Sequence, residues 1–134
     1  MAQDSLITSS QKVAIVTGAS GGIGAAVVEA CRGLGYGVTA TGRSIPSSDD
    51  RKVLALAGDV TAPGTAARLV EATTRRFGRV DTLVNCAGIF VSKPFTEYTD
   101  EDLASVVGVN VRGFFDVSRS AIGAMLARDG WGMW

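Results

Sequence analysis

A glycine-rich segment between two apolar stretches contains the residue types and spacing most able to do chemistry in this sequence. It reads TGASGGIG from Thr17 to Gly24 and lies between an apolar run and a helical pattern. At such a junction, backbone amides and the helix N-terminus can hold a pyrophosphate. Gly18 would allow the tight turn, Gly22 would let the backbone approach the phosphates, and Gly24 would let the helix pack closely on the sheet. A tight strand-to-helix turn also selects glycine, so a purely structural role stays open.

Three later segments extend this pattern along the chain. Asp59-Val60 and Asn85-Cys86-Ala87-Gly88 each follow an apolar run, and Asn110 comes shortly before the last helical pattern. Together with the glycine segment, they resemble the short-chain dehydrogenase/reductase family, which has TGxxxGxG, DV, NNAG and asparagine elements in this order. The resemblance extends from Val13 to Leu126. Cys86 is the notable departure, since it stands where the family has the second asparagine of NNAG, an element that mainly stabilises the central sheet.

The resemblance implies a dinucleotide lying along the carboxyl ends of the strands. Asp59 would bind the adenine amino group and Val60 would contact the ring, although Asp59 could also be a turn residue at a strand end. Asn85, Ala87 and Gly88 would pass beneath the adenosine ribose. The full set of expected cofactor-binding residues is Gly18, Ser20, Gly21, Gly22, Ile23, Gly24, Arg43, Asp59, Val60, Asn85, Ala87 and Gly88.

The residue types after the second apolar run bear on the choice of cofactor. NAD recognition usually places a carboxylate about 20 residues past the glycine segment, whereas a 2′-phosphate needs a cation there. Arg43 stands at this place, and no acidic residue follows before Asp49. A guanidinium suits a phosphate, so NADP(H) is favoured over NAD(H). Against this, Gly21 stands where NADP-preferring relatives often carry a second basic residue, and Arg43 could be a solvated loop residue.

The catalytic residues of the family are only partly represented. The resemblance assigns Asn110 to the proton relay, where it would support a water molecule; it could also be a helix-kink residue. The family further uses a serine and a tyrosine with a lysine four residues later, but neither Tyr36 nor Tyr98 has such a lysine. We therefore expect an NAD(P)(H)-dependent oxidoreductase for a small-molecule carbonyl or alcohol substrate, present as an incomplete chain that is inactive by itself. The alternative is a non-catalytic nucleotide-binding or assembly module.

Short apolar runs that alternate with longer helical patterns predict the fold. This alternation is typical of strand-helix-strand units around a parallel sheet. We expect an α/β, Rossmann-type parallel sheet with helices on both faces and strand order 3-2-1-4, truncated after about four strands. Residues 1–10 would be a flexible leader, and 11–134 an incomplete NAD(P)-binding domain. The predicted strands are Val13–Val16, Val38–Thr41, Val53–Ala57 and Val80–Val84.

The last helical pattern, Val111 to Arg128, is unusually apolar. Its nonpolar residues cover an arc of about 200 degrees, whereas a helix facing one core needs roughly 100. A second buried face is therefore expected, most simply a homo-oligomer contact, although a missing part of the same chain would serve equally well.

Composition excludes several other classes of protein. The 134 residues contain 13 Lys and Arg and 13 Asp and Glu, so the net charge is zero, and we expect no nucleic-acid or anionic-membrane partner. No histidine is present, which excludes the commonest catalytic triads and zinc sites, and no metal site is expected. Cys31 and Cys86 form no CxxC pair and are expected to be small buried residues. Without a signal or membrane-spanning pattern, the protein is expected to be cytoplasmic.

Overall fold

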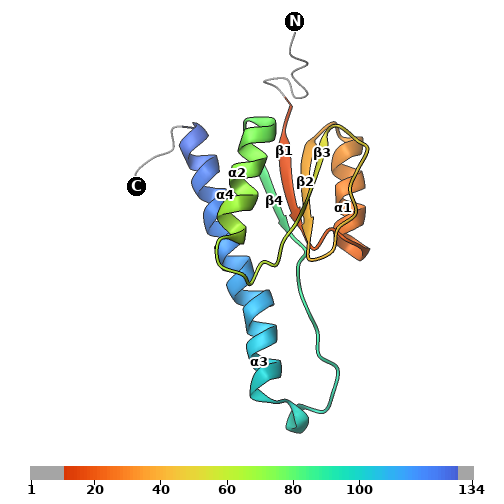
Figure 1. Ribbon diagram of the computed structural model, residues 1–134, viewed down its shortest axis with the longest axis vertical. Helices are drawn as coiled ribbons and strands as arrows, with labels where there is room; N and C mark the ends of the chain where they lie inside the picture. The colour runs from red at the N-terminus through yellow and green to blue at the C-terminus, as the bar shows by residue number, and fades with distance from the viewer. Residues whose placement is uncertain (1–10, 130–134) are drawn as a thin grey trace, which may run out of the picture.

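The computed structural model describes residues 11–129, so the predicted leader lies outside the described residues. Within that range, strands and helices alternate as expected, except that β2 and β3 are joined by a loop (Figure 1). The strands are β1 (Val13–Thr17), β2 (Gly37–Gly42), β3 (Val53–Ala57) and β4 (Thr82–Asn85). The helices are α1 (Gly22–Gly33), α2 (Thr65–Phe77), the 3₁₀ turn η1 (Phe95–Glu97), α3 (Asp100–Val107), the π-helical turn η2 (Gly108–Gly113) and α4 (Phe114–Asp129).

The four strands form one parallel sheet in the order β3-β2-β1-β4, which confirms the predicted fold class. The fourth strand is shifted from its predicted range of 80–84, because pairing with β1 begins at Thr82 and ends at Asn85. Val80 is buried before the strand begins, so its apolar character reflects packing and not strand pairing. The next residue, Asp81, donates its backbone N–H to Val13 O at 2.9 Å and accepts from Val13 N through its carboxylate at 2.8 Å.

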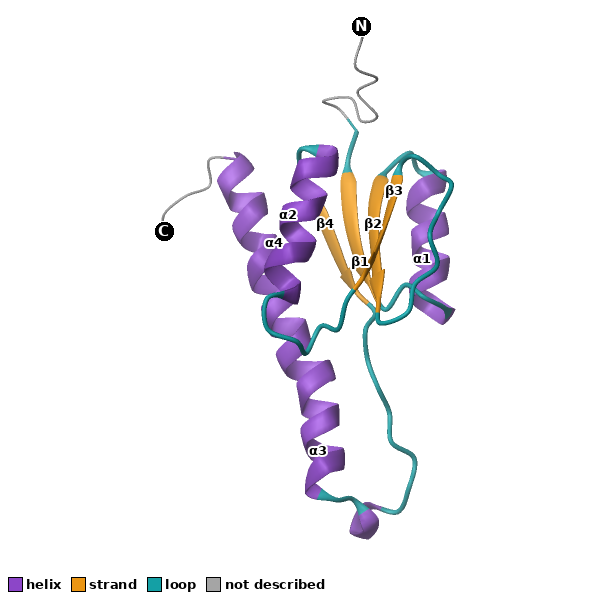
Figure 2. Cartoon of the chain, in the orientation of Figure 1, coloured by secondary structure: helices purple, strands orange, loops and turns teal. Residues whose placement is uncertain are grey.

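Helices cover both faces of the sheet, with α1 on one side and α2 and α4 on the other (Figure 2). The alternation of side chains along β1 divides the core in two. Ile15 packs in a cluster with residues of α2 and α4, whereas Val16 packs with residues next to α1. Strand β1 is completely buried, which explains the uninterrupted run of apolar residues from Val13 to Val16.

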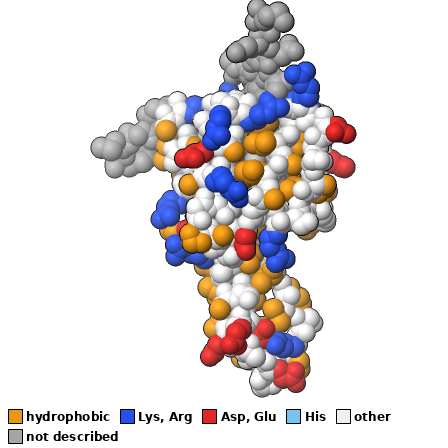
Figure 3. Space-filling view, in the orientation of Figure 1, with side chains coloured by type: hydrophobic (Ala, Val, Ile, Leu, Met, Phe, Trp, Pro, Cys, Tyr) orange, Lys and Arg blue, Asp and Glu red, His pale blue; other side chains and the backbone are white. Residues whose placement is uncertain are grey.

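The segment between β4 and α4 forms an arm that extends past the carboxyl ends of the strands (Figure 1). Helix α3 lies in this arm and begins with a capping box. Thr99 Oγ1 accepts from Asp102 N at 3.1 Å, while the Asp102 carboxylate accepts from Thr99 N at 2.9 Å. Acidic side chains gather at the far end of the arm (Figure 3), where Asp100, Glu101 and Asp102 form the first turn of α3. These carboxylates stabilise the positive end of the helix dipole.

The long apolar helix differs from its prediction at its start. Residues 111–113, expected to begin an α-helix, belong to the π turn η2, and α4 itself begins at Phe114. Gly113 allows this turn to approach Val60 closely, since a Cβ on Gly113 would lie 2.7 Å from Val60 Cγ2. π turns inside helices often mark functional positions.

Helix α4 carries two apolar stripes on opposite sides, as its wide nonpolar arc predicted. Val117 and Ala121 are completely buried against the sheet and α2. At 100° per residue, Phe115 and Ile122 point the opposite way, and each is 51% exposed.

Among the described residues, no helix is long and apolar enough to cross a bilayer.

Candidate functional site

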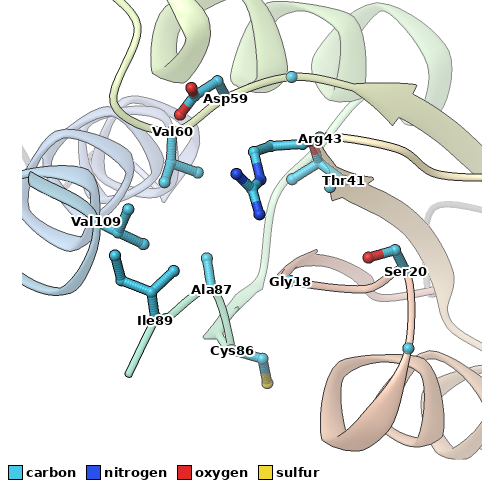
Figure 4. A pocket seen from close by; sticks show the side chains of 14 residues that line it. Gly18, Ser20, Thr41, Arg43, Asp59, Val60, Cys86, Ala87, Ile89 and Val109 are labelled. Carbon is cyan, nitrogen blue, oxygen red and sulfur yellow. The ribbon is translucent and has the colours of Figure 1, made fainter. Parts of the chain in front are cut away.

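A cavity of about 350 Å³ lies at the carboxyl ends of the strands (Figure 4). In doubly wound sheets, this edge is where ligands bind. Eight of the expected cofactor-binding residues line the cavity: Gly18, Ser20, Gly21, Arg43, Asp59, Val60, Ala87 and Gly88. The structure thus brings together residues from the ends of all four strands, which lie far apart in the sequence.

The glycine segment is shaped by two very close backbone approaches. Gly18 has a positive φ of 64°, and a Cβ there would lie 2.6 Å from the Ala87 nitrogen. A Cβ on Gly24 would lie only 2.0 Å from the Gly18 carbonyl oxygen, so helix α1 packs directly on the loop that precedes it. The loop is also tied to the neighbouring strand, since Ala19 N donates to Thr41 O at 2.9 Å. Gly18 and Gly24 therefore have the conformational and packing roles that their spacing predicted.

The N-terminus of α1 is arranged to receive an anion. Its N-cap is Gly21, which offers no side-chain cap, and the first turn contains no acidic residue. The first N–H groups of a helix have no partner within the helix, and the helix dipole adds positive potential there. The space around Gly21 and Gly22 is open, since a Cβ on either would meet nothing within 4 Å. A phosphate could therefore approach these amides closely.

One cation and one carboxylate line the cavity from the ends of two neighbouring strands. Figure 4 shows the Arg43 guanidinium reaching inward from the end of β2 and Asp59 at the end of β3. Among residues 11–129, Arg43 has no ion-pair or hydrogen-bond partner. Hydrogen bonds from the Thr61 hydroxyl and backbone N–H hold the pKa of Asp59 below its usual value, and the charge of Arg43 acts in the same direction.

Asp59 has the geometry of a turn residue, and its role in adenine binding stays a prediction. Oδ1 accepts from Thr61 N at 2.9 Å and from Thr61 Oγ1 at 2.7 Å, which is the arrangement of a turn residue. Within residues 11–129, Oδ2 has no hydrogen-bond partner, and the residue lines the cavity. The turn therefore holds the carboxylate in place and leaves one oxygen to accept from a ligand.

Asn85 does not line the cavity but helps to hold its floor together. Its amide Nδ2 donates to Ser118 Oγ at 3.0 Å, which ties β4 to α4. Nearby, Thr17 Oγ1 accepts from the backbone N–H groups of Cys86 at 3.2 Å and Ala87 at 3.1 Å. These contacts join the ends of β1 and β4, so Asn85 and Thr17 position the segment that forms the cavity floor.

Asn110 is fully engaged with a neighbouring backbone segment. Its Nδ2 donates to Ile89 O and its Oδ1 accepts from Ile89 N, both at 2.9 Å. The residue lies in the π turn η2 and does not line the cavity. Its geometry is that of a residue that fixes a helix turn to the sheet, and its catalytic role stays a prediction.

The cavity also contains residues that the sequence did not single out. Val109 and Ile89 add apolar walls. Gly42 makes room for Ser20, because a Cβ on Gly42 would lie 3.2 Å from Ser20 Oγ. Cys86 lines the cavity and is only half-buried, as is Cys31, which corrects the expectation that both are buried. The sequence offered one signal for Gly42, namely its position directly after the predicted strand Val38–Thr41.

Gly22, Ile23 and Gly24 complete the list of predicted residues outside the cavity lining. Ile23 is 77% exposed, and Gly24 is buried beneath the loop. Gly22 begins α1 with a φ of 57°. These three residues supply the backbone of the first turn of α1, next to the cavity. Ile23, the one of the three with a side chain, does not line the cavity.

Comparison with known proteins places this geometry in a family. A family model described as short chain dehydrogenase matches residues 12–133. An uncharacterized oxidoreductase of Staphylococcus saprophyticus is 35% identical over 125 residues, which is 86% of this chain and 53% of that protein. The 3-hydroxyacyl-CoA dehydrogenase type-2 of Bos taurus is 37% identical over 127 residues, which is 84% of this chain and 48% of that protein. The chain thus spans about half the length of these relatives.

Solved structures agree with the sequence comparison. A short-chain dehydrogenase/reductase from Serratia marcescens superposes with a TM-score of 0.78 at 37% identity, covering 85% of this chain and 52% of that one. The ligand-free aldohexose dehydrogenase of Thermoplasma acidophilum gives a TM-score of 0.80 at 29% identity, covering 87% and 45%. Members of this family use an NAD(P) dinucleotide and a small-molecule substrate. The parallel sheet, the glycine segment packed against β4 and the family match over residues 12–133 together show that this chain belongs to the short-chain dehydrogenase/reductase family of oxidoreductases.

Proposed function

We propose that this chain is the nucleotide-binding portion of an NADP(H)-dependent reductase or dehydrogenase acting on a carbonyl or alcohol. One observation carries the proposal: the uncapped N-terminus of α1 and the guanidinium of Arg43 lie at the same cavity. The α1 amides would hold the pyrophosphate, and Arg43 would meet a 2′-phosphate. The bound dinucleotide would supply the hydride, while the residues of this chain bind and orient its adenosine half.

The preference for NADP(H) over NAD(H) depends on the charge at the end of β2. Gly42 ends that strand and Arg43 follows it, and neither offers a carboxylate to a ribose 2′-hydroxyl. Asp59, the acidic residue of the cavity lining, already gives Oδ1 to Thr61. A 2′-phosphate therefore gains a charge-assisted contact that a 2′-hydroxyl does not.

Direct binding measurements test this preference. We expect NADPH to bind the chain more tightly than NADH, and Arg43→Ala to raise the Kd for NADPH by roughly tenfold or more, since hydrogen bonds to charged groups contribute about 1.5–3 kcal/mol. The Kd for NADH should change little. Arg75→Ala, which removes an exposed cation from α2, is the matched control. Equal affinity of the unmodified chain for the two nucleotides would contradict the proposed preference.

We also propose that the 134-residue chain by itself does not turn over substrate. The support is chemical, because the sequence contains no tyrosine followed four residues later by lysine, and so lacks the family's proton donor. Oxidation of NADPH by the pure chain with any carbonyl compound would overturn this part of the proposal.

We further propose that the protein forms a homo-oligomer through the region 111–128. The support is the apolar stripe of α4 that faces away from the sheet, where Phe115 and Ile122 are each 51% exposed. Phe115→Asp should abolish association in analytical ultracentrifugation, because it would bury a charge at the contact. Phe90→Asp, on the exposed arm, should leave association unchanged.

A cytoplasmic location remains a prediction from the sequence.

A further inference from the structure

A second cavity lies on the α1 face of the sheet, next to the proposed dinucleotide site, with which it shares Ser20. Strands β2 and β3 are joined by the loop 43–52, which contains no helix. Val53 and Ala55 of β3 pair with Val38 and Ala40, which face the α1 side, yet both β3 residues are only half-buried. Helix α1 packs on β1 and β2, so the outer part of this face is left as a hollow of about 500 Å³. This volume is within the range of small-molecule sites.

Apolar residues of β2, β3, α1 and the loop 43–52 form the floor and walls of the hollow. Ala40 and Ala55 form the floor, Ala25 and Val28 form the α1 wall, and Ile45 lies on the loop side. The two floor side chains are alanines, so they leave room above the sheet. A bound molecule would need an apolar body to replace water here favourably.

The rim of the hollow carries a net negative charge. Arg32 closes one end, where its Nε donates to Asp50 Oδ2 at 2.7 Å and its Nη1 donates to Tyr36 O at 2.7 Å. The Arg32 hydrogen bond holds the pKa of Asp50 below its usual value, so this pair is ionised and neutralises itself. Glu29, one helical turn before Arg32, is exposed and has no partner within residues 11–129. One carboxylate at the rim is therefore left without a counter-charge.

We propose that this hollow binds a small primary amine with an apolar body. The body would lie on Ala40 and Ala55, and the ammonium group would stand beside the Glu29 carboxylate. Anions are disfavoured because the nearby guanidinium is already held by Asp50 and the Tyr36 carbonyl. The inference goes beyond the proposed function, since the hollow is a separate site that requires no nucleotide.

Equilibrium dialysis of the 134-residue chain with phenethylamine tests the proposal, with 2-phenylethanol and 3-phenylpropionate as compounds of matched shape. We expect saturable binding of the amine, weaker binding of the alcohol and weakest binding of the acid. Glu29→Gln should weaken amine binding by about threefold, the size expected of one exposed ion pair. Glu101→Gln, which removes an exposed carboxylate in the arm, should leave amine binding unchanged.

Filling the hollow gives an independent test of where the amine binds. Ala55→Leu should abolish binding, and Ala25→Leu fills the same space from the α1 wall if the first variant does not fold. Thermal unfolding of each variant verifies that it is folded. The proposal is wrong if the amine shows no saturable binding, if the three compounds bind equally, or if a folded filling variant binds the amine as well as the unmodified chain.

Discussion

The close approach of α1 to the glycine segment makes Gly24→Ala the most informative substitution in this chain. A Cβ at residue 24 would lie 2.0 Å from the Gly18 carbonyl oxygen and 2.7 Å from the Gly18 carbonyl carbon, whereas real Cβ contacts are at least 3.0 Å. Both atoms belong to the backbone, so the helix or the loop must move by about 1 Å. Overpacking of this kind costs about 3 kcal/mol at the upper end of its usual range.

Two opposing effects decide the net change in the free energy of unfolding. Replacing glycine by alanine inside a helix returns up to about 1 kcal/mol through helix propensity. The net loss should therefore be about 2 kcal/mol, which lowers Tm by roughly 8 °C in a chain of this size. Since Gly18 lines the nucleotide cavity, the same shift should also weaken NADPH binding.

A glycine in the same helix provides the control. Gly33 is exposed in the last turn of α1, and a Cβ there would meet nothing within 4 Å. Gly33→Ala should leave the free energy of unfolding unchanged or raise it by up to about 1 kcal/mol. Urea denaturation monitored by circular dichroism compares the two variants. If Gly24→Ala were as stable as Gly33→Ala, the packing argument for this segment would be refuted.

Two further substitutions test the polar contacts that support the sheet. Burial raises the pKa of Asp81, but hydrogen bonds from Arg79 and Val13 N outweigh it and leave the pKa lowered. Its stabilising effect is therefore present above pH of about 4 and is lost as pH falls through the lowered value. Urea denaturation of the unmodified chain should show the free energy of unfolding falling between pH 5 and 2. Asp81→Asn should make this fall smaller, because the variant has no carboxylate to protonate at residue 81. Thr73 and Thr39 share a buried hydroxyl contact of 2.8 Å, so Thr73→Val should cost about 1–3 kcal/mol, and the double valine variant should recover part of that loss in the same assay. A double variant less stable than the single would contradict this account.

Local patterns in the sequence were sufficient to predict the sheet. The apolar run of β1 reflects a strand buried on both faces. Gly18, in the turn between β1 and α1, reflects a positive φ of 64° that favours glycine. These features depend on residues close together in the chain, so periodicity and residue type reveal them. The strand order was predictable from the fold class that the alternation of apolar runs and helical patterns indicates.

Contacts between distant segments were decided by the tertiary structure. Val80 looked like part of a strand, but the pairing of β4 with β1 begins only at Thr82. The sequence did not show that both polar side-chain atoms of Asn110 bond to Ile89, a residue 21 positions earlier in the chain.

The same holds for the two cavities. Val109 and Gly42 reach the first cavity only because four strand ends and a π turn meet there, and the second exists only because the β2–β3 loop leaves part of the sheet uncovered. Residue type determines which groups could bind a ligand. Which of them face a common space depends on packing between segments far apart in the chain, which no local pattern encodes.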